Sequence, residues 1–201
     1  MSDTFIPYGR QSIDENDIAA VLATLQSEFL TQGPKVPAFE QALCARCDAT
    51  HAVAVNSATS ALHIACLALG LKPGGLLWTV PNTFVASANC GLYCGAEVDF
   101  VDIDPQTWCL STQSLADKLE KAARAKRLPD IVVAVDFAGQ PCDRDALADL
   151  KAHYGFRLIA DAAHALGAQW RGQPVGGAGP ADITVFSFHP VKIIATGEGG
   201  M

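Results

Sequence analysis

Hydrophobic and polar positions alternate between two kinds of segment along most of the chain. Short apolar runs, rich in Val, Ile, Leu and Phe, each have the length of one strand. They cover residues 52–55, 76–80, 98–101, 131–135, 156–160 and 183–186. Because these runs are almost continuously apolar, we expect strands that are covered on both faces of a sheet.

Longer segments with helical spacing lie between these runs. They include residues 60–69, 112–127 and 144–153. Strands that alternate with helices in this way predict an α/β fold, in which helices flank a mainly parallel sheet. In such sheets, ligands bind beyond the carboxyl ends of the strands. The residues that follow each apolar run are therefore the first candidates for function.

Two amphipathic helices are predicted before the first apolar run. From Ser12, the sequence SIDE has the form of a capping box. The apolar face of the first helix then repeats at Ile18, Val21, Leu22 and Leu25. A turn at residues 31–34 separates it from a second helix, which repeats at Val36, Phe39 and Leu43.

Composition and charge exclude several classes of function. Half of the 201 residues are apolar, which is enough to bury a core in a single domain, residues 1–201. The net charge is -7 and no segment is rich in Lys or Arg, so we expect no nucleic acid and no membrane as partner. No apolar run has the length of a membrane span, and residues 1–11 lack the pattern of a secretory signal. We therefore expect a cytoplasmic protein.

The seven cysteines are dispersed and odd in number, unlike the disulfide framework of a small secreted domain. We expect them to be reduced. Cys44 and Cys47 form a C-x-x-C motif, but they continue the helical spacing of Phe39 and Leu43. No second pair of ligands has the spacing of a zinc site, so we predict a helix face and no metal.

Small and aromatic residues follow the first two apolar runs. Residues 56–60 (NSATS) open a helix, whose unpaired N–H groups and partial positive charge attract anions. Ser57, Ala58 and Thr59 are small enough to let a phosphate approach, although an ordinary N-cap has the same appearance. Phe84 follows the second run, where it would either stack on a flat ligand or belong to the core.

A carboxylate and an imidazole follow the fifth run. Asp161 comes directly after residues 156–160, at a depth where a carboxylate needs a cationic or hydrogen-bonding partner. A protonated pyridine nitrogen would supply that partner. His164 would orient Asp161 or reach a hydroxyl on the ring of the ligand, and otherwise it is an ordinary satisfied polar residue.

A lysine follows the last run, in residues 187–192 (SFHPVK). Burial lowers the pKa of a lysine and makes its amine a nucleophile toward an aldehyde, whereas Lys192 considered alone is better explained as an exposed loop residue. A phosphate cradle, an aromatic ring, a carboxylate and an amine thus follow one another at strand ends. Together they predict a site for pyridoxal 5'-phosphate (PLP).

Five segments carry a resemblance to a known family. They are residues 30–34 (LTQGP), 56–62 (NSATSAL), 83–86 (TFVA), 161–168 (DAAHALGA) and 187–192 (SFHPVK). The chain resembles the DegT/DnrJ/EryC1/StrS family of sugar aminotransferases, which are fold type I PLP enzymes, over essentially its whole length. Within that family, residues 87–90 (SANC) and 92–96 (LYCGA) resemble the transaminases of pseudaminic acid biosynthesis.

The resemblance implies a role for each candidate residue. Lys192 would form the Schiff base with PLP, Asp161 would hold the pyridine nitrogen, and His164 would lie beside the ring hydroxyl. Phe84 would stack on the ring. The phosphate would be held by Ser57, Ala58, Thr59 and Ser187. Lys192 also separates the chain from the sugar dehydratases of the family, which have His at that position.

The reaction that the resemblance implies is the transfer of an amino group, with glutamate as the expected donor. The acceptor would be C4 of a UDP-linked 4-keto-6-deoxy-N-acetylhexosamine, in the biosynthesis of pseudaminic acid or a related amino sugar. The family resemblance also implies a homodimer whose active sites are built across the interface.

The chain departs from the family pattern in two respects. Residues 74–77 (GGLL) lack the acidic residue that relatives usually have after the first Gly. Family members are also longer, so residues 1–201 are expected to form the large cofactor-binding domain without its last strand and the small C-terminal domain. An inactive remnant, which at most binds PLP or a full-length partner, is therefore the competing hypothesis.

A nucleotide-binding Rossmann module is a third hypothesis. No G-x-G-x-x-G motif follows the first apolar run, and the glycines in residues 176–179 stand in the wrong context for one. The sequence therefore favours an aminotransferase.

Overall fold

A parallel sheet forms the centre of the computed structural model, which describes residues 5, 7 and 9–201. Within these residues the sheet has five strands in the order β2-β1-β3-β4-β7. The strands are β1 (Leu76–Thr79), β2 (Glu97–Phe100), β3 (Ile131–Val135), β4 (Arg157–Asp161) and β7 (Ile183–Val185). A separate antiparallel pair consists of β5 (Gln169–Trp170) and β6 (Gln173–Pro174). The predicted α/β class is confirmed.

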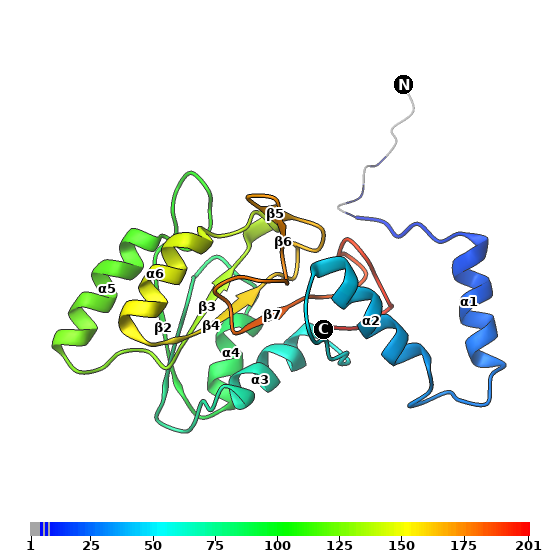
Figure 1. Ribbon diagram of the computed structural model, residues 1–201, viewed down its shortest axis with the longest axis horizontal. Helices are drawn as coiled ribbons and strands as arrows, with labels where there is room; N and C mark the ends of the chain where they lie inside the picture. Colours follow the sequence, from blue (N-terminus) through cyan, green and yellow to red (C-terminus); the bar gives the residue numbers. More distant parts are fainter. Residues whose placement is uncertain (1–4, 6, 8) are drawn as a thin grey trace.

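Helices flank this sheet in two layers (Figure 1). One layer packs α3 and α4 against one face, and the other packs α5 and α6 against the opposite face. The helices are α1 (Glu15–Leu25), α2 (Lys35–Cys47), α3 (Ala58–Ala68), α4 (Ala86–Tyr93), α5 (Thr112–Arg124) and α6 (Arg144–Tyr154). A short 3-10 turn, η1 (Phe137–Gly139), follows β3.

The two central strands direct alternate side chains to the two layers, as the two-residue period of a strand requires. Ile131 and Val133 of β3 and Ile159 of β4 join the core beneath α3 and α4. Val132 and Leu158 join the core beneath α5 and α6. Because both faces are covered, β3 and β4 read as continuous apolar runs in the sequence.

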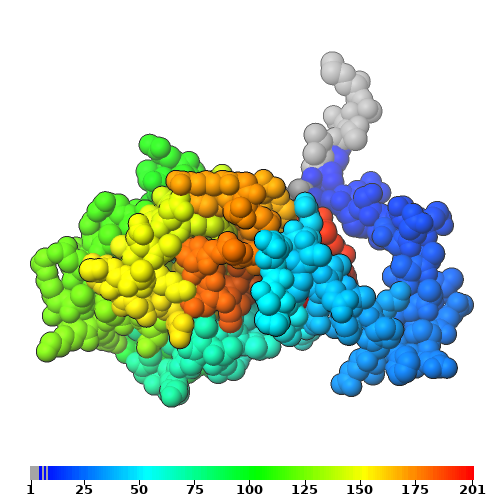
Figure 2. Space-filling view, viewed as in Figure 1, coloured from blue at the N-terminus to red at the C-terminus, as the bar shows by residue number. Residues whose placement is uncertain are grey.

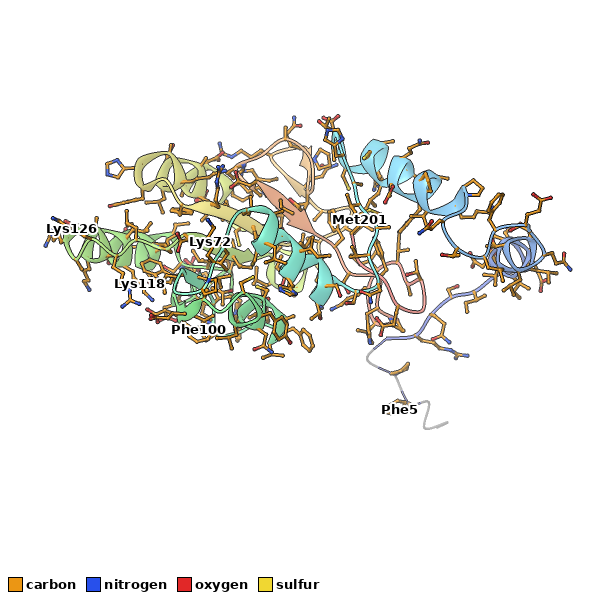
Figure 3. The ribbon with its side chains drawn as sticks, turned by 90° about the horizontal axis from the view of Figure 1, so that it is seen from below. Phe5, Lys72, Phe100, Lys118, Lys126 and Met201 are labelled. Atoms are coloured by element: carbon orange, nitrogen blue, oxygen red, sulfur yellow. The ribbon has the colours of Figure 1, made fainter. Side chains whose placement is uncertain are left out.

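Helix α2 covers a third core beyond β7. Its buried residues Leu43 and Cys47 lie with Phe186, Phe188 and Met201. Met201 lies between the sheet and α2 (Figure 3). Cys44 and Cys47 are therefore two residues of a helix, as their spacing predicts. All seven cysteines are free thiols in the structure.

Helix α1 stands apart from the rest of the molecule (Figure 2). It contains no buried residue, and the side chains of its apolar face, Ile18, Val21, Leu22 and Leu25, are all more than half exposed. The predicted capping box at Ser12 is wrong by two residues. Asp14 caps the helix, because its carboxylate accepts hydrogen bonds from the N–H groups of Asn16 and Asp17. In return, the carboxylate of Asp17 accepts a hydrogen bond from the N–H of Asp14.

Two predictions about strands are wrong. Residues 52–55 form no strand, and of these residues Val55 alone makes an isolated antiparallel bridge, to Gly200. The run at residues 98–101 was expected to be covered on both faces. The corresponding strand, β2, is an edge strand on which only Val98 is even partly buried.

Helix α4 was not predicted, because its small residues give almost no hydrophobic period. The position of α4 in the fold explains why these residues are small. A Cβ added at Gly91 would lie 3.0 Å from Val98 and 3.1 Å from Leu77, so the helix backbone packs directly onto the sheet.

Across the part of the chain that is described, no helix has both the length and the apolar character needed to cross a membrane.

Candidate active site

One cavity of about 910 Å³ lies at the carboxyl ends of β3, β4 and β7. It contains every candidate residue from the sequence: Ser57, Ala58, Thr59, Phe84, Asp161, His164, Ser187 and Lys192. These residues are far apart in the chain, from Ser57 to Lys192. The fold thus brings the proposed phosphate cradle, aromatic ring, carboxylate and amine to one place.

The N-terminus of α3 forms one wall of this cavity. Ser57 is the N-cap, and its Oγ accepts a hydrogen bond from the N–H of Ser60 at 3.2 Å. The N–H groups of Ala58 and Thr59 belong to the first turn, where a helix offers no internal partner. Both residues line the cavity, so the helix presents its positive end and two donors at the surface where an anion would bind.

A close backbone contact at Gly200 joins this wall to Ser187. Gly200 exchanges two backbone hydrogen bonds of 2.9 Å with Val55 and also forms a bridge with Ser187. A Cβ added at Gly200 would lie 2.4 Å from the carbonyl carbon of Ser57. Only glycine fits this position, and its backbone holds the start of α3 next to Ser187.

Asp161 occupies the end of β4 and is 6% exposed. Ser87 Oγ donates a hydrogen bond to its Oδ2 at 2.6 Å, and the N–H of Ala163 donates to its Oδ1 at 3.2 Å. The carboxylate is therefore buried but not isolated, which is the condition under which a buried charge is tolerated.

Lys192 and His164 meet across the cavity, where Nζ and Nε2 are 2.5 Å apart. Burial lowers the pKa of Lys192, and the negative charge of Asp161 opposes this effect. Burial also lowers the pKa of His164, and the neighbouring charge of Lys192 lowers it further. Both shifts favour the neutral forms, so the site holds an amine that is more nucleophilic than an ordinary lysine.

Phe84 lies in the loop between β1 and α4 and is 73% exposed. The alternative that Phe84 belongs to the core is wrong. An exposed aromatic ring on the wall of a cavity is a surface on which a flat ligand can stack.

A second buried carboxylate, Asp136, also lines the cavity and was missed in the sequence. It follows an entirely apolar run, as Asp161 does, so the same signal could have found it. Its oxygens are engaged, because Arg144 pairs with Oδ2 at 2.8 Å and the N–H of Cys142 donates to Oδ1 at 2.9 Å. Burial raises the pKa of Asp136 against the effect of Arg144. Among the residues that the structure describes, no cationic side chain pairs with Asp161 as Arg144 does with Asp136, so Asp161 is the better candidate for a cationic ligand.

Another cavity, of about 650 Å³, lies between α2, α3 and β7. None of the candidate residues lines it, and its walls come from α2, α3 and β7 together with the loop residues 48–53 and 176–182. Its carboxylate Asp182 is already paired with Lys151 and Arg157, so this cavity is a poorer candidate for a catalytic site.

The profile of the DegT/DnrJ/EryC1/StrS aminotransferase family matches residues 11–201. The chain belongs to this family. The resemblance that the five sequence segments carry is thus confirmed.

The curated relatives of this DegT/DnrJ/EryC1/StrS chain include a UDP-4-amino-4,6-dideoxy-N-acetyl-beta-L-altrosamine transaminase of Campylobacter jejuni (strain 81-176). The two are 44% identical over 197 residues, which are 97% of this chain and 50% of the relative. The corresponding transaminase of strain NCTC 11168 is 43% identical with the same coverage. The chain therefore spans about half the length of the curated relatives it matches.

Solved structures of the same family superpose closely on the chain. Helicobacter pylori PseC, described as an aminotransferase of pseudaminic acid biosynthesis, gives a TM-score of 0.86 at 33% identity, covering 96% of this chain and 50% of PseC. A Streptococcus pneumoniae protein described as a sugar aminotransferase, solved in its PLP form, gives 0.86 at 31% identity, covering 97% of this chain and 52% of that protein. The fold type I assignment is confirmed.

Proposed function

We propose that the protein is a PLP-dependent aminotransferase of a nucleotide-linked keto sugar. The observation that carries the proposal is the group of Lys192, His164 and Asp161 in one cavity, opposite the N-terminus of α3. A nucleophilic amine, a buried carboxylate and an anion-binding helix end are the three features that PLP requires of a protein.

The residues present fit this cofactor. Ser57, Ala58, Thr59 and Ser187 would hold its phosphate, since the first three open α3 and the fourth is bridged to them through Gly200. Phe84 would stack on its ring, and Asp161 would pair with its pyridine nitrogen. The volume of about 910 Å³ leaves room for a substrate beside the cofactor.

Bound PLP would supply an electron sink for the transfer of the amino group. The protein supplies the proton transfers. Burial lowers the pKa of Lys192, so its Nζ would more readily be in the form that accepts a proton and returns it, and His164 Nε2 is close enough to share that proton. Asp161, held by Ser87 and Ala163, would keep a negative charge fixed where a positive charge is to be stabilised.

The proposed acceptor is C4 of a UDP-linked 4-keto-6-deoxy-N-acetylhexosamine, and the proposed donor is glutamate. The name of the C. jejuni relative and the sequence of residues 87–96 support this acceptor. The family resemblance supports the donor and a homodimer.

Reduction with borohydride in the presence of PLP tests the proposal. The expected result is a pyridoxyl group on the peptide that contains Lys192. A matched control is Lys151→Arg, because Lys151 is also a partly buried lysine but pairs with Asp182 outside the cavity. Lys192→Arg should abolish the label and Lys151→Arg should leave it unchanged. A label on another lysine, or none, would contradict the proposal.

A turnover measurement on the same protein distinguishes the proposed enzyme from the competing hypothesis of an inactive chain that only binds PLP. Turnover with glutamate and a UDP-linked 4-keto sugar is measured after the label has been located at Lys192. Label without turnover would support the inactive chain, whereas turnover would exclude it.

A further inference from the structure

Ser87 is the most completely buried polar side chain beside the site, at 0% exposure. It lies in the first turn of α4 and donates the 2.6 Å hydrogen bond to Asp161 Oδ2. Its Oγ is also 2.8 Å from Oγ1 of Thr83. No step proposed for the reaction uses either hydroxyl directly, so both contacts call for another explanation.

The direction of this chain of hydrogen bonds follows from counting protons. A serine hydroxyl has one proton to donate, and an ionised carboxylate can only accept. Because Ser87 gives its proton to Asp161, the hydroxyl of Thr83 must donate to Ser87. The chain therefore runs from Thr83 through Ser87 to Asp161.

We propose that Ser87 is a positioning residue, which together with Thr83 fixes the carboxylate of Asp161 in the orientation that the cofactor requires. The inference rests on the proposed function. Thr83 precedes Phe84 in the same loop, so these hydrogen bonds also connect the carboxylate of Asp161 to the loop that carries the aromatic ring.

The rigidity of α4 is what makes Ser87 suitable for this role. Ala86, Cys90 and Gly91 of the same helix are buried against the sheet, so Ser87 cannot move without disturbing that packing. Ala163 holds the other oxygen of Asp161. A rotation of the carboxylate would break both contacts, and the carboxylate is therefore oriented before any ligand arrives.

Four proteins test this inference through PLP affinity, measured by absorbance titration. Ser87→Ala removes the donor to Asp161, and Ser87→Thr retains a hydroxyl. Thr83→Val removes only the outer link. Thr79→Val is the matched control, because Thr79 is also 0% exposed but donates to the carbonyl of Val133 and takes no part in the hydrogen bonds from Thr83 through Ser87 to Asp161.

Ser87→Ala should weaken PLP binding by about tenfold, which corresponds to the loss of one hydrogen bond to a charged group. The PLP affinity of Ser87→Thr should lie within about threefold of that of the wild type, and the affinity of Thr83→Val should lie between those of Ser87→Ala and Ser87→Thr. Thr79→Val should bind PLP as the wild type does, even where it lowers the melting temperature. Thr83 is only partly buried, so Thr83→Val keeps the test available where Ser87→Ala does not fold.

Wild-type protein separates the two ways in which the inference can fail. If the wild type takes up no PLP, the proposed function is wrong and the inference falls with it. If the wild type binds PLP, and both Ser87→Ala and Thr83→Val bind it with the affinity of the wild type, only the inference about Ser87 is overturned. Equal weakening by Ser87→Ala and Thr79→Val would also overturn it, because the effect would then be a general loss of packing.

Discussion

Asp161 and Lys192 line the same cavity, but they are held by very different structures. Asp161 ends a central strand that pairs on both sides, and its two oxygens each accept a hydrogen bond. Lys192 belongs to a loop without regular structure, in which Val191, Ile193 and Ile194 are exposed. The side-chain contact that positions its amine is the one with His164.

This difference separates the source of stability from the source of reactivity. The carboxylate side of the site is continuous with the core, so a change there is expected to affect folding as well as chemistry. The lysine side contacts the core at few points, so a change there is expected to affect chemistry alone. Five measurements can contradict or refine this division.

Lys192→Arg should have the largest effect on turnover. An arginine keeps the positive charge but cannot be deprotonated, so it offers no nucleophile. Turnover should fall below detection, while the free energy of unfolding of the apoprotein should change by no more than about 0.5 kcal/mol. Steady-state kinetics and denaturant unfolding on the same preparation check both statements. A large loss of stability would show that the loop is as firmly integrated as the strand.

Asp161→Asn should still bind PLP but lose about 100-fold to 1,000-fold in turnover, the usual cost of removing one electrostatic stabiliser. The amide keeps the size of the side chain and an oxygen that accepts from the Ala163 N–H, and its NH2 group can donate to Ser87 Oγ in place of the bond that Ser87 donates in the wild type, but the negative charge is lost. The ratio of turnover to that of the wild type at saturating substrate is the quantity to measure. Near-normal turnover would mean that Asp161 is a structural carboxylate.

Arg144→Leu should destabilise the protein by about 3 kcal/mol, because it leaves Asp136 buried without its cationic partner. The matched control is Arg124→Leu, which removes an exposed pair with Glu120 and should cost about 0.5 kcal/mol or less. Urea unfolding of both variants measures the difference. Equal losses would show that the ion pair at the carboxylate side contributes no more than one at the surface.

The loss in Arg144→Leu should also depend on pH. Without Arg144, only the hydrogen bonds from Cys142 still oppose the burial that raises the pKa of Asp136, so the folded state binds a proton more readily than the unfolded state does. The variant should therefore recover stability as the pH falls toward 3.8, the ordinary value of an aspartate, relative to the wild type. Unfolding curves at a series of pH values follow this recovery.

The smallest effect is a shift in the pH dependence of PLP uptake. The neutral amine of Lys192 is the reactive form, and burial places its pKa below the ordinary value of 10.5. The rate of PLP uptake should therefore reach half its maximum below that pH. Because the charge of Asp161 raises the pKa of Lys192, Asp161→Asn should move the midpoint lower still. An upward shift would contradict the proximity of the two groups.

The sequence predicted best those elements that the core defines by itself. The run at residues 131–135 coincides with β3, because a strand covered on both faces needs an uninterrupted apolar run. Helix α4 escaped prediction because Gly91 packs its backbone against Leu77, which is a tertiary contact and not a periodic pattern. Residues 52–55 are apolar enough for a strand, but in the described part of the chain Val55 finds its partner only in distant Gly200.

The candidate site was predictable to the extent that each residue follows a strand or opens a helix. Asp161 and Ser57 are of this kind, since the end of β4 and the start of α3 fix their places. The support for Asp161 was not predictable. Ser87 is 74 residues away in the sequence, and only the packing of α4 brings it to the carboxylate.

The glycine contact at position 200 has a consequence for how the sequence can diverge. The start of α3 and the segment that contains Ser187 meet through main-chain atoms, without a side chain between them. The spacing of the anion-binding wall is therefore independent of which side chains surround it. Any side chain at position 200 would collide with the main chain of Ser57 and Ala58, so a library of random substitutions at this position, selected for PLP binding, should retain glycine.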